Sequence, residues 1–171
     1  MALLRQSATS LADVFITATR PVRWTPKRIT YANRALFSGL RLARPQSHWV
    51  TADDGHKTQV WVLQPPRPRR RKMPAVLEIH GGPHAQYGVD FFHEFQLLAA
   101  AGYIVVYGNP RGSKGYGRDH CAAIKGKWGT ADWLDVQGIL QFMKAHPSID
   151  NRFLGVMGGS YGGYMTNWVY S

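Results

Sequence analysis

The stretch that decides the fold is "LGVMGGSYGGYMTNWVYS" at residues 154–171, in which a serine flanked by glycines lies between two apolar segments. The apolar run before the serine predicts a buried strand, and the run from Tyr161 onward predicts a helix. Gly158, Ser160 and Gly162 match the pattern G-x-S-x-G, which is typical of a sharp strand-to-helix turn that holds a serine hydroxyl in the open. The stretch therefore predicts a nucleophile elbow centred on Ser160.

Upstream of this turn, short apolar runs alternate with amphipathic segments in a regular order. The apolar runs predict buried strands at residues 75–79, 103–107 and 152–157. The amphipathic segments predict helices at residues 91–102 and 130–147. Strands that are apolar throughout and lie between such helices are typical of a parallel sheet covered on both faces, so the sequence predicts an α/β fold.

Two further features refine this series. Thr130 is the expected N-cap of the second helix, with Asp132 in its first turn and Pro147 at its end. Before the series, the alternating segments at residues 48–52 and 58–66 are separated by the turn signal "DDG" and predict an antiparallel hairpin. We therefore expect a mostly parallel sheet with an antiparallel hairpin leading into it.

Each predicted parallel strand is followed by a glycine-rich loop, and the functional residues of such sheets lie in loops at this end. The loop after the first strand reads HGGPH at residues 80–84, and a hydrolase of this architecture supplies one oxyanion donor from a loop of this kind. The helix N-terminus at Tyr161 offers a second backbone N–H. We interpret His80 as a structural histidine beneath the loop, because it precedes the serine in the chain, and His84 as a loop residue without a chemical role.

Four segments together resemble the catalytic domain of the prolyl oligopeptidase (S9) family of serine peptidases, in particular its acylaminoacyl-peptidase-like branch. They are "PAVLEIHGGPHAQYG" (74–88), "NPRGSKGYG" (109–117), "WGTADWLDV" (128–136) and "GGSYGGYMTNW" (158–168). The resemblance covers about residues 48–171. It implies an α/β-hydrolase fold and the hydrolysis of peptide bonds, with no cofactor and no metal.

Carried onto this sequence, the resemblance makes Ser160 the nucleophile, with the backbone N–H groups of Tyr161 and Gly82 as the oxyanion hole. His80 stands where the prolyl oligopeptidase branch has a tyrosine whose hydroxyl assists the oxyanion hole, so we rely on the backbone donor instead. Arg111 is expected to orient the loop beside the site, with a loop salt bridge as the alternative.

Residues 1–45 show no clean helical or strand period. They resemble, more weakly, the end of the β-propeller that precedes the catalytic domain in this family. The resemblance therefore divides the chain into a propeller remnant or irregular tail at residues 1–45 and the N-terminal part of a catalytic domain at residues 46–171.

The chain has no Asp, Glu or His after Ser160, although the triad in this fold runs in the order Ser, then Asp or Glu, then His. Without a general base, a serine hydroxyl is a poor nucleophile. We expect the chain to be a fragment that has only trace activity alone and is completed by further sequence, by a partner or by oligomerisation. The expected substrate is a peptide.

The formal net charge is +11, and part of it lies in the basic run at residues 67–72. A basic run between apolar segments is usually a solvated loop, and no nucleic-acid-binding motif accompanies it, so we expect no nucleic-acid partner. Two alternatives are an esterase of the same fold and a noncatalytic basic module that binds an anionic partner through residues 1–45 and 67–72. The wording of "GGSYGGYM" and "NPRGSKGYG" favours a peptidase.

The cellular compartment is predicted from two weaker signals. Cys121 is the only cysteine, which excludes an intrachain disulfide and agrees with a reducing compartment. The sequence contains no run of about 18 apolar residues that would span a membrane. We expect a cytoplasmic protein that does not associate with membranes.

Overall fold

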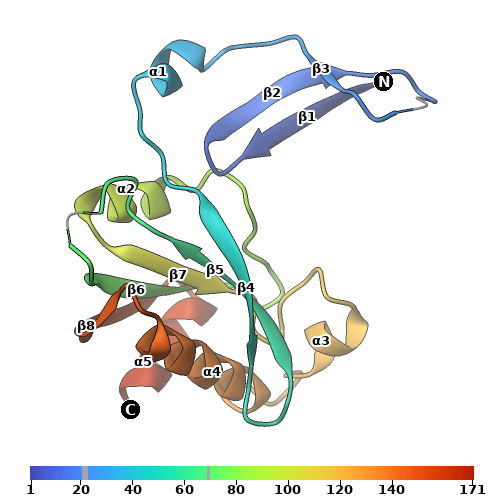
Figure 1. Ribbon diagram of the computed structural model, residues 1–171. Helices are drawn as coiled ribbons and strands as arrows, with labels where there is room; N and C mark the ends of the chain where they lie inside the picture. The colour runs from blue at the N-terminus through green and yellow to red at the C-terminus, as the bar shows by residue number, and fades with distance from the viewer. Residues whose placement is uncertain (21–22, 69) are drawn as a thin grey trace.

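The computed structural model describes residues 1–20, 23–68 and 70–171. The basic run predicted at residues 67–72 is only partly covered, because Arg69 lies outside the described residues. The described residues form two sheets, a three-stranded sheet near the N-terminus and a five-stranded sheet against which the longer helices pack (Figure 1).

The N-terminal sheet is antiparallel. It consists of β1 (Ala2–Ser7), β2 (Ser10–Ile16) and β3 (Lys27–Arg28), and the short helix α1 (Arg34–Ser38) follows it. The buried carboxylate of Asp13 accepts hydrogen bonds from the Thr30 hydroxyl and from the Arg28 guanidinium. The sequence shows no clean strand period here, because both faces of β1 and β2 are largely exposed or half-buried.

The second sheet holds the predicted strand series. Its spatial order is β4-β5-β7-β6-β8. The strands are β4 (Pro45–Thr51), β5 (Lys57–Leu63), β6 (Met73–Ile79), β7 (Ile104–Gly108) and β8 (Ile149–Gly158).

The pairing of these strands confirms the hairpin and the parallel series but corrects the expected proportion. β4 and β5 form the predicted antiparallel hairpin, and β6 pairs parallel with both β7 and β8. The expectation of a mostly parallel sheet was wrong, because β5 also pairs antiparallel with β7 and makes the sheet mixed.

Helices cover both faces of this sheet. Figure 1 shows α2 on one face and α4 and α5 on the other, with α3 beyond the end of the sheet. The helices are α2 (His93–Ala101), α3 (Arg118–Ala122), α4 (Ala131–Ala145) and α5 (Tyr161–Tyr170).

The side chains of β5 alternate between two hydrophobic clusters, as the two-residue period of a strand requires. Val60 and Val62 belong to the larger cluster, which includes buried residues of α4 and α5. Trp61 and Leu63 point the other way, into a cluster that includes buried residues of α2. The five-stranded sheet is therefore buried on both faces, as predicted for an α/β fold.

The helix ends differ slightly from the predictions. α2 begins two residues later than expected, and it ends before Gly102, which adopts the left-handed conformation with φ 103°. Thr130 occupies the N-cap position of α4, but its hydroxyl donates to the Lys127 carbonyl and caps nothing. The capping prediction was wrong because the Asp132 carboxylate accepts hydrogen bonds from backbone N–H groups there, including that of Thr130 itself at 2.8 Å.

Within residues 1–20, 23–68 and 70–171, no helix is both long and apolar enough to cross a membrane.

Candidate active site

The predicted elbow is present at the end of β8. The strand ends at Gly158, α5 begins at Tyr161, and Ser160 lies between them with an exposed side chain. Ser160 has φ 57° and ψ −121°, and it is the only non-glycine residue with positive φ in the part of the chain that the structure describes. A side chain in this region costs about 1–3 kcal/mol, which the surrounding structure must offset.

The two glycines of the elbow are required by the strand next to it. A Cβ atom on Gly158 would lie 2.4 Å from the Ile79 carbonyl oxygen, and one on Gly162 would lie 1.9 Å from the same oxygen. The end of β6 is therefore pressed against the turn, and only a residue without a side chain fits at either position.

The loop that follows β6 lies directly against the serine. A Cβ atom on Gly81 would lie 3.3 Å from the Ser160 Cβ and 3.9 Å from its Oγ. Gly82 has φ 126°, and a Cβ atom there would lie 2.6 Å from the backbone nitrogen of His84. The structure thus brings the HGG loop and the elbow together, although 78 positions separate Gly82 from Ser160 in the sequence.

Tyr161, the first residue of α5, is held by a hydrogen bond to the start of α4. The buried Tyr161 hydroxyl donates to the Asp132 carboxylate at 2.5 Å, and burial together with this carboxylate raises the pKa of Tyr161. Asp132 also accepts hydrogen bonds from the N–H groups of Gly129, Thr130 and Trp133. The start of α4 therefore holds the start of α5, and with it the backbone of the elbow.

His80 connects the HGG loop to the next loop. Its ring is buried, with Nδ1 2.8 Å from the Gly81 carbonyl oxygen and Nε2 2.8 Å from the Ser113 hydroxyl. Burial lowers the pKa of His80, so the ring is neutral at pH 7. The neutral ring carries one N–H, which can donate either to the Gly81 carbonyl or to the Ser113 hydroxyl, and the Ser113 hydroxyl itself donates to the Pro110 carbonyl at 2.6 Å. His84 is exposed, with its Nδ1 3.0 Å from the Gly112 carbonyl oxygen.

Arg111 is held in a network of ion pairs. Its guanidinium donates to Asp135 through Nε and through Nη2, the latter at 2.7 Å, and to Asp54 through Nη1 at 2.6 Å. Its backbone N–H also donates to Asp135, which is fully buried on α4. These contacts fix the loop after β7 to α4 and to the turn of the β4–β5 hairpin. Arg111 therefore forms salt bridges within this loop region, which was the alternative to a role in orienting the site.

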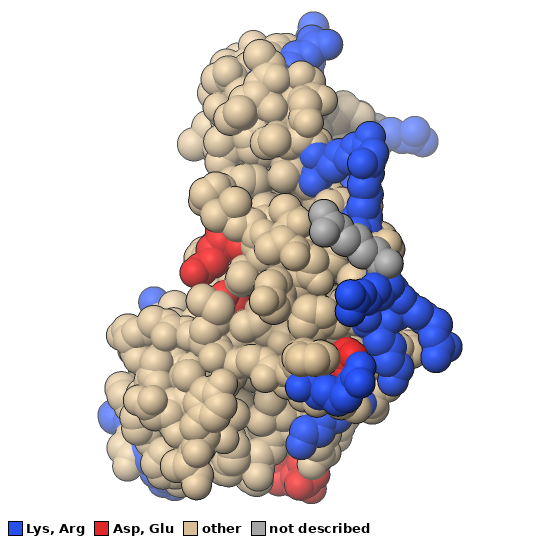
Figure 2. All heavy atoms as spheres, turned by 90° about the vertical axis from the view of Figure 1, so that its left-hand side faces the viewer, with Lys and Arg blue, Asp and Glu red and all other residues tan. Residues whose placement is uncertain are grey.

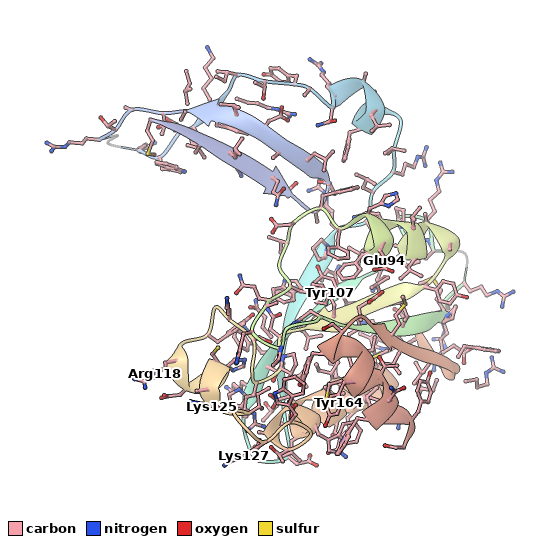
Figure 3. All side chains as sticks on the ribbon, turned by 180° about the vertical axis from the view of Figure 1, so that it is seen from behind. Glu94, Tyr107, Arg118, Lys125, Lys127 and Tyr164 are labelled. Atoms are coloured by element: carbon pink, nitrogen blue, oxygen red, sulfur yellow. The ribbon has the colours of Figure 1, made fainter. Side chains whose placement is uncertain are left out.

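A cavity of about 680 Å³ opens beside the elbow on the face of the sheet that α2 covers. Its wall includes Gly81 of the HGG loop and Gly158 and Gly159 of the elbow. Two carboxylates, Glu78 and Glu94, also line it. Figure 3 shows Glu94 and Tyr107 on this side of the sheet, and Tyr164 on the opposite side.

Several residues that shape this region were not singled out from the sequence. Asp135, Ser113 and Glu78 each lie within a quoted motif, but a buried polar residue in a helix, a loop or a strand gives no direct sign of its partner. The useful signal for Asp135 is its spacing from Asp132, because polar residues three apart share one face of an otherwise apolar helix.

Among the described residues, no group of three or more His, Cys, Asp and Glu side chains is placed to hold a metal ion.

Comparison with known proteins gives the family. Residues 89–171 match the family model of the prolyl oligopeptidase family. An uncharacterized peptidase, YuxL, of Bacillus subtilis is 43% identical over 151 residues, which cover 87% of this chain and 23% of that protein. Dipeptidyl-peptidase 5 of Porphyromonas gingivalis is 31% identical over 154 residues, which cover 87% of this chain and 22% of that protein.

The solved structures agree. The uncomplexed acylaminoacyl peptidase of Pyrococcus horikoshii superimposes with a TM-score of 0.86 at 34% identity, over 97% of this chain and 26% of that one. The chain thus spans about a quarter of the length of the relatives it matches. On this sequence and structural similarity, the chain belongs to the prolyl oligopeptidase family of serine peptidases, which have the α/β-hydrolase fold.

Proposed function

We propose that Ser160 is the nucleophile of a serine-type peptidase that cleaves peptide bonds by acyl transfer. The observation that carries this proposal is the exposed Ser160 at a left-handed φ of 57°, with the HGG loop packed against it. In the first step the Ser160 Oγ forms a bond to the carbonyl carbon and its proton passes to a base. Collapse of the tetrahedral intermediate breaks the C–N bond and releases the protonated amine, and water then hydrolyses the ester.

The oxyanion of that intermediate needs donors that are already in place. We propose the backbone N–H of Tyr161, at the start of α5, and the backbone N–H of Gly82 for this role. The hydrogen bond of Tyr161 to Asp132 and the close approach of Gly81 to Ser160 support the assignment, because they keep both backbones rigid. One such donor contributes about 3–4 kcal/mol to stabilising the transition state in other serine hydrolases.

The base and its orienting acid are proposed to come from outside residues 1–171. No Asp, Glu or His follows Ser160, and the fold places the triad acid and histidine after the nucleophile. Residues 1–171 alone should therefore show no more than trace turnover.

Peptides are the proposed substrates. The relatives are named as peptidases, and an acylaminoacyl peptidase that is 34% identical was solved in complex with Z-Gly-Gly-Phe-chloromethyl ketone, a peptide derivative. That complex concerns the relative, and it supports a peptide rather than an ester as the natural substrate here.

A fluorophosphonate probe tests the proposal, because it phosphonylates activated serine nucleophiles. We expect a form of the protein extended past Ser171 to be labelled, and Ser160→Ala to abolish the labelling. Ser38→Ala, which removes another exposed serine, serves as the matched control and should label normally. Equal labelling of the Ser160→Ala variant would reject the assignment.

A further inference from the structure

The cavity beside the elbow contains a carboxylate with no partner. Glu78 is 2% exposed, and its Oε1 atom has no hydrogen-bond partner among the described residues. A buried carboxylate without a partner is strongly unfavourable, because water no longer solvates its charge. A second carboxylate, Glu94 in the first turn of α2, lines the same cavity.

In the described part of the chain, no Lys or Arg side chain lines the cavity with Glu78. The titratable groups that line the cavity with it are His80 in the loop that follows β6, Tyr87 in the loop before α2, and Glu94. His80 is neutral because burial lowers its pKa, and Tyr87 stays protonated because burial raises its pKa. Burial and the charge of Glu94 raise the pKa of Glu78 to about 7, so the cavity gains negative charge as the pH rises above 7.

The remaining wall of the cavity suits an organic cation. The rings of Tyr87 and Phe92 both line it and contact each other with their centroids 5.6 Å apart. Aromatic rings attract ammonium and guanidinium groups through their electron-rich faces. The volume of about 680 Å³ is in the range of ligand pockets, and the cavity shares Gly158 and Gly159 with the elbow.

We propose that this cavity is a subsite for a positively charged group of the substrate, an ammonium or a guanidinium carried near the peptide bond that Ser160 attacks. Glu78 is its anionic partner, Glu94 adds to the negative potential, and Tyr87 and Phe92 form the walls. This inference rests on the proposed function, since it assigns part of the substrate of the same site.

The first test compares phosphonate probes on the form extended past Ser171. One probe carries a lysine side chain and an acetylated N-terminus, a second replaces lysine with norleucine, and a third has norleucine and a free N-terminal amine. We expect at least one cationic probe to label Ser160 about tenfold faster than the neutral probe at pH 8. Whichever cationic probe labels Ser160 faster shows whether the group bound in the cavity is a side-chain ammonium or the N-terminal amine of the substrate.

Variants separate the subsite from general effects of charge. Glu78→Gln should bring the ratio of cationic to neutral labelling rates to about one, and Glu94→Gln should lower it partly. Asp119→Asn removes an exposed carboxylate from α3 as the matched control and should keep the ratio. At pH 6 the ratio should fall in the unmodified protein, because Glu78 is then protonated. A ratio near one at pH 8, or an unchanged ratio in Glu78→Gln, would overturn the subsite while the proposed function stands.

A second test does not depend on the reactivity of Ser160. Benzamidinium is titrated into residues 1–171 at pH 8 and followed by NMR, with the uncharged isostere benzamide as the control. We expect benzamidinium to bind at least about tenfold more tightly than benzamide, and Glu78→Gln to remove the difference. If the neutral probe fails to label Ser160, the proposed function falls, and this titration still decides the subsite: equal binding of the two compounds would overturn it.

Discussion

At the residue scale, the turn around Ser160 depends on its contact with the end of β6. The Ile79 carbonyl oxygen occupies the space that side chains at Gly158 and Gly162 would need. The glycines of the G-x-S-x-G pattern thus have a physical cause in the packing of two neighbouring parallel strands. The pattern alone predicts the turn, but it does not show which atom excludes the side chains.

Gly162→Ala tests this packing. Alanine normally stabilises a helix relative to glycine by about 1 kcal/mol. Here we expect the opposite, a loss of about 3 kcal/mol or more in the free energy of unfolding, because the new Cβ would lie 1.9 Å from the Ile79 oxygen. Urea denaturation measures this change. Gly159→Ala, where no heavy atom lies within 4 Å of the new Cβ, is the control and should lose much less. Equal stability of the two variants would refute the contact.

Glu78 should make stability depend on pH. Its pKa is raised to about 7 in the folded protein, from 4.5 without the protein environment, so the folded state binds the proton more tightly. Glu78 therefore does not lower the free energy of unfolding below pH 4.5. As the pH rises from 4.5 to about 7, its ionisation lowers the free energy of unfolding progressively. Glu78→Gln removes this loss, and we expect the variant to be more stable by about 3 kcal/mol at pH 8.5 and unchanged at pH 4.5. Urea denaturation at both pH values checks this, and a difference independent of pH would contradict it.

At the scale of elements, the start of α4 supports the start of α5. Asp132 accepts hydrogen bonds from three backbone N–H groups at the start of α4 and from the Tyr161 hydroxyl. The sequence predicted both helices and most of the strands, because their apolar residues follow clear periods. It misassigned the cap to Thr130, since a carboxylate two residues further along can fold back onto the same N–H groups.

Two substitutions at this helix start should differ strongly. Asp132→Ala leaves three backbone N–H groups and the buried Tyr161 hydroxyl without their acceptor, and we expect it to lower the free energy of unfolding by about 3 kcal/mol or more. Thr130→Ala removes only a hydroxyl that donates to the Lys127 carbonyl at the surface, and it should cost less than about 1 kcal/mol. Thermal unfolding of both variants measures the contrast. A larger loss for Thr130→Ala would show that threonine is the cap after all.

The three-stranded N-terminal sheet shows the limit of sequence patterns at this scale. Its strands have no buried face long enough to produce alternation, and polar contacts such as those of Asp13 hold it together. Such contacts join residues up to 17 positions apart, so the local periodicity of the sequence does not predict them. Whether this sheet is the end of a β-propeller stays a prediction.

At the scale of the whole molecule, Gln96 joins the two sheets. Its Nε2 donates to the carbonyl oxygens of Ala8 and Ala43, and its Oε1 accepts from the Ala43 N–H. Gln96 lies on α2, so this buried amide links the N-terminal sheet, the connection before β4 and the helix. The sequence places a boundary near residue 45, and the division into residues 1–45 and 46–171 stays a proposal that this narrow link supports.

Gln96→Ala should loosen that link. We expect a loss of about 2–3 kcal/mol in stability and faster tryptic cleavage between residues 28 and 44, because three backbone groups lose a buried partner. Gln141→Ala, at an exposed position of α4, is the control and should be cleaved like the unmodified protein. If Gln96→Ala were cleaved no faster, the amide would not hold the two sheets together.

The distribution of charge is also a property of the whole molecule. Figure 2 shows Lys and Arg side chains gathered along one edge of the face in view, from the N-terminal sheet down to the five-stranded sheet. Arg70, Lys72 and Arg152 line a hollow together with Asp150 and Asn151. The cavity beside the elbow is lined instead by carboxylates, so the site has the opposite sign to the net charge of +11. Net charge alone therefore does not predict the ligand of this site.

The most direct measurement locates a phosphonate adduct on the chain. A form extended past Ser171 is treated with a fluorophosphonate and digested with trypsin, and the peptide that begins at Phe153 is fragmented in a mass spectrometer. If Ser160 is the nucleophile, the added mass lies on Ser160 and is absent after denaturation of the protein before treatment. An adduct on Ser171 or on a peptide from another part of residues 1–171, with Ser160 unmodified, would contradict the role proposed for the elbow.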